Sequence, residues 1–168
     1  MENWNQVILV DENDNEIGQK DKLLAHIDGD LHRAFSIFIF NSKNEILLQK
    51  RSITKYHSPG LWTNTCCSHP QPGLPMEICL SERLKVEMGM ECDLVHWFSF
   101  KYKAEFENGL IEHEYDHVYK GYSDELPALN GEEASDYQYI IVDNLKIDLE
   151  SNPEKYTSWL KLIIDRIG

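Results

Sequence analysis

The 168-residue chain has few basic side chains: 16 lysines and arginines stand against 29 aspartates and glutamates, which gives a formal net charge of −13. Such an excess of acid disfavours binding to nucleic acid or to an anionic membrane surface, because both need a basic face. The chain also lacks any apolar run near the roughly 20 residues of a membrane-spanning helix, and its start does not resemble a signal peptide. We therefore expect a cytoplasmic protein with no nucleic-acid or membrane partner, folded as one domain over residues 1–168.

Cysteine is scarce, and its spacing excludes two common uses. The four residues Cys66, Cys67, Cys79 and Cys92 form neither a zinc-type Cys-x-x-Cys pair nor the dense set of a secreted disulfide scaffold. A bridge between the adjacent Cys66 and Cys67 would close a strained ring. We therefore expect reduced thiols, with Cys79 and Cys92 as small buried apolar residues.

A Gly-x-Gly-x-x-Gly motif after a strand is also absent, which excludes a dinucleotide-binding fold. Apolar alternation and turn residues predict strands over residues 6–10, 34–40, 45–49, 94–103, 110–122 and 137–142. Helical spacing predicts a helix over residues 75–88 that ends at Gly89, and an amphipathic helix that begins at Asn152 and continues to Ile167. Strands and helices interleaved in this way predict an α+β fold.

The most informative stretch is Trp-Thr-Asn-Thr-Cys-Cys-Ser-His-Pro, residues 62–70, which reads as extended. Alternate residues of a strand face the same way, so Cys67 and His69 can reach one pocket. Cys66 should then point to the opposite face. A thiol and an imidazole directed into one pocket indicate a catalytic site.

Carboxylates repeat this arrangement in Glu112-His113-Glu114. Strand parity places the two glutamates on one face and His113 on the other, so His113 is not expected to be a ligand. Two more histidines, His26 and His32, lie in a stretch that we interpret as a loop. Together these residues predict a metal site beside the thiol.

These motifs, with the spacing from residues 62–70 to Glu87-Met88-Gly89, resemble type 1 isopentenyl-diphosphate isomerase over residues from about Val7 to Trp159. The resemblance implies the Nudix fold, a mixed sheet flanked by helices. It also implies interconversion of isopentenyl and dimethylallyl diphosphate in isoprenoid biosynthesis. Moving that double bond requires one proton delivered to an alkene and another removed nearby, through a carbocation-like state.

A Nudix-type diphosphate hydrolase is the alternative with the same fold. Its sequence box needs a glycine, a glutamate, an Arg-Glu pair, paired acids and a last glycine. The matching positions here hold Ser68, Leu74, Glu82-Arg83 and Val86-Glu87, with Gly89 retained. Because one metal-binding acid of the box remains, hydrolysis through several metal ions is poorly supported. A noncatalytic metal-binding module is a further alternative, but it leaves Cys67 unexplained.

The resemblance also implies roles residue by residue. Cys67 matches the catalytic cysteine, and Glu114 matches the second catalytic residue, which acts with the phenol that aligns at Tyr102. The family's metal ligands fall on His26, His32, His69, Glu112 and Glu114, a nitrogen and oxygen set that suits magnesium, manganese or zinc. A second ion, Mg²⁺, is expected to bridge Glu87 and the diphosphate.

Substrate-binding positions follow from the same match. Lys22, Arg51, Lys55 and Arg83 correspond to phosphate-contacting residues. Trp159 corresponds to an aromatic residue near the hydrocarbon, where its electron-rich face stabilises a passing carbocation. The implied partner is a small allylic or homoallylic diphosphate, and we expect a monomer or weak homodimer.

The remaining histidines and one acid receive no such role. We expect His57, His96 and His117 to be surface or hydrogen-bonded core side chains. Asp116 shares the strand face of Glu114. We expect it to lie behind the site at most.

Overall fold

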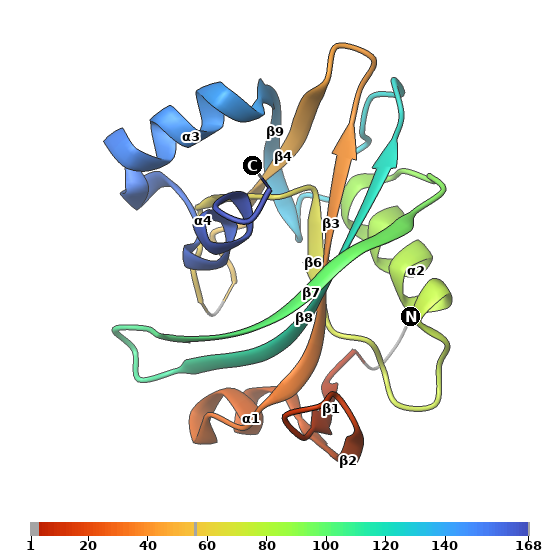
Figure 1. Ribbon diagram of the computed structural model, residues 1–168, viewed down its shortest axis with the longest axis vertical. Coiled ribbons are helices and arrows are strands. Elements are labelled where there is room, and N and C mark those ends of the chain that lie inside the picture. Colours follow the sequence, from red (N-terminus) through yellow and green to blue (C-terminus); the bar gives the residue numbers. More distant parts are fainter. Residues whose placement is uncertain (1–3, 56, 168) are drawn as a thin grey trace.

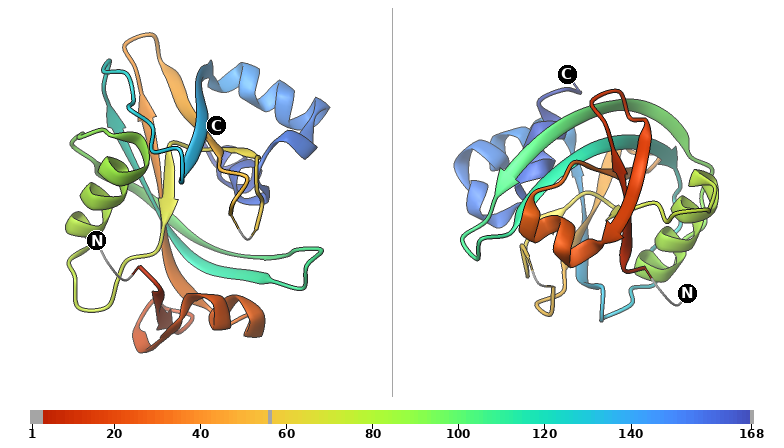
Figure 2. Two further views of the ribbon diagram at one scale, coloured as in Figure 1. Left: turned by 180° about the vertical axis from the view of Figure 1, so that it is seen from behind. Right: turned by 90° about the horizontal axis from the view of Figure 1, so that it is seen from below.

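The computed structural model describes residues 4–55 and 57–167. Within these residues the chain forms one mixed sheet of nine strands with helices on both faces, which confirms the expected α+β fold (Figure 1). Figure 2 shows α2 (Met76–Met88) on one side of the sheet and α3 (Val142–Ser151) with α4 (Ser158–Ile164) on the other. None of the described helices is long and apolar enough to cross a membrane.

The other elements confirm most of the predicted strands. In chain order they are β1 (Gln6–Val10), β2 (Glu16–Asp21), α1 (Lys22–Asp28), β3 (His32–Phe40), β4 (Glu45–Arg51), β5 (Trp62–Thr63), β6 (Cys66–Ser68), β7 (Val95–Glu105), β8 (Ile111–Tyr122), β9 (Ala134–Ile141) and a 3-10 turn over Pro153–Lys155. The helix predicted over residues 75–88 is α2, and Gly89 ends it in the left-handed conformation as expected.

β3 lies at the centre of the strands that carry the predicted site. β8 pairs with β3 in parallel, with His32 opposite Glu114, and β6 pairs with β3 antiparallel, with Ser36 opposite Cys67. β7 pairs with β8 and places Tyr102 opposite Glu114. Side chains directly opposite each other on neighbouring strands share a face, so the sheet brings together residues that are distant in sequence.

Two apolar clusters cover the two faces of the sheet. The cluster under α2 includes Leu84 and the fully buried Cys66, whereas the cluster under α3 and α4 includes Trp159, with Cys67 packed against it. Residues 34–40 of β3 are almost continuously apolar because both faces of this strand are covered. Cys66 and Cys67 therefore point to opposite faces, as strand parity predicts.

The single C-terminal helix predicted from Asn152 is wrong. α3 ends before that point, and the 3-10 turn and an extended stretch separate it from α4. Tyr156 forms a bridge with Trp62, and the Thr157 N–H donates to the Trp62 carbonyl at 3.0 Å. Pairing with β5 therefore interrupts the helix. The strand predicted over residues 137–142 ends at Ile141, because residue 142 begins α3.

The loop predicted around the first two histidines is also wrong. α1 begins where the Asp21 side chain accepts from the Leu24 N–H, and it ends at Gly29, whose φ of 75° is left-handed. His26 lies on α1 and His32 begins β3, and both side chains are fully buried. β2, an edge strand that the pattern did not predict, leads directly into this helix.

Candidate active site

A cavity of about 320 Å³ is lined by residues of α1, β6, α2, β8, α4 and the loop after β4. Most of the site residues expected from the sequence line it. They are Lys22, Arg51, Lys55, Cys67, His69, Arg83, Glu87, Glu112, Glu114 and Trp159. The other three, His26, His32 and Tyr102, are buried and contact the two lining glutamates.

Cys67 presents its thiol to this cavity. The thiol donates to Asn64 Oδ1 at 2.8 Å, and the Trp159 indole N–H donates to Cys67 Sγ at 3.3 Å. The Asn64 amide donates to the carbonyls of Ile37 and Cys66, which fixes its oxygen toward the thiol. Burial, followed by the negative charges of Asp116 and Glu87, raises the pKa of Cys67 to about 12. The thiol is therefore protonated at neutral pH and can act as a proton donor.

The carboxylates on β8 share a hydrogen-bond partner. The Tyr102 hydroxyl lies 2.5 Å from Glu112 Oε1 and 2.7 Å from Glu114 Oε1, and it donates its single proton to one of them at a time. Burial and the nearby charge of Glu114 raise the pKa of Glu112 well above its usual range. Burial also opposes ionisation of Glu114, but the neighbouring His32 and His69 imidazoles outweigh it and lower the pKa of Glu114. The three groups thus form a short path for a proton.

Four imidazoles surround the remaining carboxylate oxygens. For Glu114, Oε2 lies 3.0 Å from His69 Nε2 and 3.4 Å from His32 Nε2. For Glu112, Oε2 lies 3.9 Å from the Nε2 of His26. The fourth imidazole is His57, whose Nε2 lies 3.5 Å from the same oxygen of Glu112.

Two of these rings are held in the tautomer that binds a metal. His26 Nδ1 lies 2.7 Å from the Lys22 carbonyl, and His32 Nδ1 lies 2.9 Å from the Asp30 carbonyl. A carbonyl only accepts, so Nδ1 carries the proton in both rings and Nε2 keeps its lone pair. Burial lowers the pKa of His69 to about 3, which keeps that ring neutral as well.

The donor atoms fit a divalent ion. The ligand atoms of His26, His32, His69 and Glu114 all lie within 4.8 Å of one another, and so do those of His26, His57 and Glu112. Neutral imidazole nitrogens with carboxylate oxygens suit zinc, manganese and related divalent ions. His57, which the sequence led us to expect as an ordinary surface or core side chain, is buried and lines this cavity, where its ring faces Glu112.

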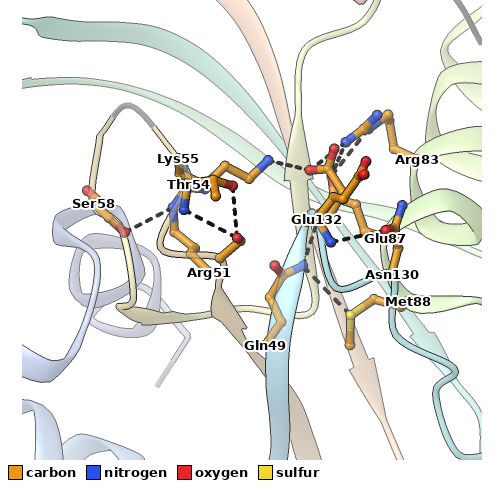
Figure 3. Close-up of polar contacts among 12 residues, drawn as sticks. Gln49, Arg51, Thr54, Lys55, Ser58, Arg83, Glu87, Met88, Asn130 and Glu132 are labelled. Carbon is orange, nitrogen blue, oxygen red and sulfur yellow. Dashed lines mark hydrogen bonds and ion pairs between the residues drawn. The ribbon is translucent and has the colours of Figure 1, made fainter.

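The other end of the cavity is basic (Figure 3). Arg83 Nη2 lies 2.8 Å from Glu87 Oε2 and 3.2 Å from Glu133 Oε2, and Lys55 Nζ donates to the same oxygen of Glu133. Gln49 Nε2 donates to Glu87 Oε1 at 3.0 Å, so both oxygens of this carboxylate are held. Glu133 lies just before β9, where no pattern in the sequence indicated a site residue.

Two more cations extend this basic end. Burial, then the positive charges of Lys55 and Arg83, lowers the pKa of Lys22. Arg51 donates to the carbonyls of His57 and Ser58, and its guanidinium lies 5.4 Å from the Trp159 ring centre. Cations that repel one another in an enclosed cavity favour binding of a polyvalent anion.

Residues expected outside the site remain there. His113 Nδ1 donates to the Gly29 carbonyl at 3.1 Å and does not face the glutamates, and His96 and His117 both contact Ser99. Asp116 is fully buried, and the Ser36 hydroxyl donates to it at 2.7 Å. Burial and the charge of Glu114 raise the pKa of Asp116 to about 8.

Sequence comparison agrees with this geometry. The family model described as NUDIX domain matches residues 30–160. An "Isopentenyl-diphosphate Delta-isomerase 1" from Aromatoleum aromaticum is 51% identical over 96% of this chain and 92% of that protein. A second isomerase of that organism is 49% identical over 96% of this chain and 86% of its own length. An isomerase from Pectobacterium atrosepticum is 46% identical over 96% of this chain and 90% of its own length.

Solved structures share the fold at low sequence identity. A protein from Deinococcus radiodurans superposes with a TM-score of 0.79 at 21% identity, covering 96% of this chain and 98% of that one. A MutT protein from Methanosarcina mazei superposes with a TM-score of 0.65 at 17% identity, covering 81% of this chain and 91% of that one. The fold is thus that of a NUDIX domain, with a thiol and a cluster of imidazoles in its cavity. Within that fold, the chain belongs to the isopentenyl-diphosphate Delta-isomerase family.

Proposed function

We propose that this protein interconverts isopentenyl diphosphate and dimethylallyl diphosphate as a step of isoprenoid biosynthesis. One observation supports this most strongly: the Cys67 thiol and the Glu114 carboxylate line the same cavity, whose other end is basic. A substrate with an anionic head and a short hydrocarbon tail matches that division of the cavity. The chemistry needs two proton carriers and an anchor for the diphosphate, and the lining residues supply the carriers as well as the anchor.

Cys67 and Glu114 are the proposed proton carriers, with Tyr102 as the partner of Glu114. The thiol carries its proton at neutral pH, and Tyr102 links Glu114 to a second carboxyl group. Trp159 donates to the thiol and is 3% exposed, so it also helps to exclude water from the reacting carbons. Its ring face favours positive charge nearby.

A divalent ion is proposed at the imidazole end. His26, His32, His69, Glu112 and Glu114 would hold it, in line with the donor atoms gathered there. When bound, the ion would supply positive charge beside Glu114 and so control when that carboxylate holds a proton. Magnesium, manganese and zinc are each compatible with this donor set.

The diphosphate is proposed to bind at the basic end. Lys22, Arg51, Lys55 and Arg83 line that part of the cavity and would contact phosphate oxygens. Glu87 lies between Arg83 and Gln49, where it can share a Mg²⁺ ion with the diphosphate. The protein is proposed to act as one domain, in the cytoplasm, as a monomer or weak homodimer.

Hydrolysis of a diphosphate is the second function that this fold suggests. It is disfavoured because α2 offers Glu87 to the cavity where a hydrolase needs several acids. Isomerisation and phosphate release should be measured on one preparation with isopentenyl diphosphate as substrate. We expect dimethylallyl diphosphate without release of phosphate. Phosphate release without isomerisation would make the hydrolase assignment correct instead.

A further inference from the structure

One imidazole of the cavity has no role in the proposed site. His57 is 7% exposed, and its Nε2 lies 3.5 Å from Glu112 Oε2. An imidazole nitrogen directed at a buried carboxylate is an arrangement that a shared metal ion can bridge.

Glu112 and Glu114 have the same surroundings. In each, Oε1 contacts the Tyr102 hydroxyl and Oε2 faces two imidazole Nε2 atoms. For Glu114 both imidazoles belong to the ligand set expected from the sequence. For Glu112, one of the two imidazoles belongs to that set, and His57 supplies the other. This equivalence indicates that His57 has the same role as the other three rings.

The ring of His57 is held in a fixed orientation. It stacks on Phe106, with ring centres 5.2 Å apart and 7° between the ring planes. It also packs edge-on against Trp159, with ring centres 5.8 Å apart. The Arg51 guanidinium donates to the His57 carbonyl at 3.1 Å. Contacts that fix the ring while Nε2 points at Glu112 are what a metal ligand requires.

The two groups of donors share one residue, His26, and so cannot each hold an ion of their own. His26 belongs to both, and its Nδ1 is occupied by the Lys22 carbonyl, so Nε2 alone can bind a metal. One lone pair binds one ion. We therefore propose that His57 is a further protein ligand of this single ion, joining the five residues expected from the sequence.

This inference rests on the metal site proposed above and adds to it. Four imidazole nitrogens and two carboxylate oxygens would make six donors, the number an octahedral ion takes, once the two groups close around the ion that they share through His26. With all six bound, no position is left for water or for the substrate. The ion would then act on the reaction through the charge it places beside Glu114, and not by binding the substrate itself.

The first test uses the unmodified protein loaded with Co²⁺. Each metal-bound imidazole gives one exchangeable, strongly shifted N–H proton in the NMR spectrum, so protons that vanish in deuterium oxide count the ligating rings. We expect four. Three such protons would leave the proposed metal site in place and overturn the role of His57. None at all would overturn both the metal site and this inference.

The second test compares two variants with a matched control. His57→Phe keeps a ring that can stack on Phe106 but removes the nitrogen, whereas His57→Ala removes both. His96→Phe makes the same change at an exposed histidine outside the cavity. Co²⁺ affinity is measured by competition with a coloured chelator, together with the visible spectrum of the bound ion.

Loss of a ligand should weaken Co²⁺ binding about tenfold or more in both His57 variants and alter the spectrum. The control should match the unmodified protein. If His57 only packs against Phe106, His57→Phe keeps full affinity and an unchanged spectrum, and the inference is wrong. Circular dichroism of each variant establishes that it is folded, and the proton count above does not depend on any variant.

Discussion

The Trp159 indole N–H donates to Cys67 Sγ at 3.3 Å, although α4 and β6 are far apart in the sequence. The same indole lies 5.4 Å below the Arg51 guanidinium. Trp159 therefore touches the proposed proton donor with one edge and a proposed phosphate ligand with its face. The thiol end and the basic end of the proposed substrate site therefore both contact the Trp159 side chain.

Cys67→Ala should abolish isomerisation, while Cys66→Ala should keep most of it. Cys67 lines the cavity, whereas Cys66 is fully buried under α2. Loss of a general acid or base typically slows a reaction about 10²- to 10⁴-fold. The Cys66 variant should lose stability instead, by about 1–2 kcal/mol. Turnover and thermal unfolding of both variants check this, and similar loss of turnover in two folded variants contradicts it.

Arg51→Ala and Lys55→Ala should each raise the KM for isopentenyl diphosphate. Both residues line the basic end of the cavity, away from the thiol and glutamates. A lost hydrogen bond to a charged group costs about 1.5–3 kcal/mol, or roughly 10- to 100-fold in KM, with a smaller effect on kcat. Lys50→Ala is the matched control, because Lys50 lies next to Arg51 but does not line the cavity. Unchanged KM in both test variants would remove these cations from the site.

Strand parity is the reason that much of the site could be predicted from the sequence. Side chains alternate along β6 and β8, so the directions of Cys67, Glu112 and Glu114 follow from their positions alone. The structure places all three at the cavity and turns Cys66 and His113 away. Helix α2 was equally predictable, because its apolar spacing and Gly89 specify its end locally.

Other features depend on contacts that no local pattern encodes. His57 lies in a loop without periodicity, and its direction is set by Phe106 and Trp159. Glu133 joins the site through Lys55 and Arg83, which come from two other parts of the chain. The break before α4 likewise arises from pairing with β5, which overrides a helical pattern.

The Cys67 thiol should react slowly with iodoacetamide. A thiol with a pKa of about 12 is roughly one part in ten thousand thiolate at pH 8, against roughly a quarter for an ordinary cysteine. The pKa is raised, so the reactive form appears only as pH rises, and the alkylation rate should climb without a plateau between pH 7 and about 10. Peptide mass spectrometry of folded and urea-unfolded protein measures this. A plateau below pH 9 in the folded protein contradicts a protonated thiol.

Removal of divalent ions should inactivate and destabilise the protein. Without an ion, the imidazoles and carboxylates of the site face one another at 3.0–3.9 Å with no shared cation. An ion present at about 100 times its Kd stabilises the folded state by about 2.7 kcal/mol, so chelation should lower the Tm. Adding back a divalent ion should restore both Tm and turnover. Full activity in protein shown to be metal-free by elemental analysis rules out this site.

The last prediction concerns the two proton carriers. Protonation at one carbon and deprotonation at another exchange solvent hydrogen into the product, so a reaction run in deuterium oxide should label the new methyl group of dimethylallyl diphosphate. Glu114→Gln should then lower turnover about 10²- to 10⁴-fold, even though Cys67 and the basic residues are unchanged. The substitution is nearly isosteric, so lost activity cannot come from a change in volume.

Glu114 is also a proposed metal ligand, so the metal content of Glu114→Gln must be measured before its turnover is interpreted. Glu105→Gln, at the exposed end of β7, is the control for the same chemical change and should behave like the unmodified protein. If metal-loaded Glu114→Gln turned over at a near-normal rate, Glu114 would not be a proton carrier. Product without deuterium would falsify the two-sided mechanism itself, because it requires the substrate's own proton to move from one carbon to the other.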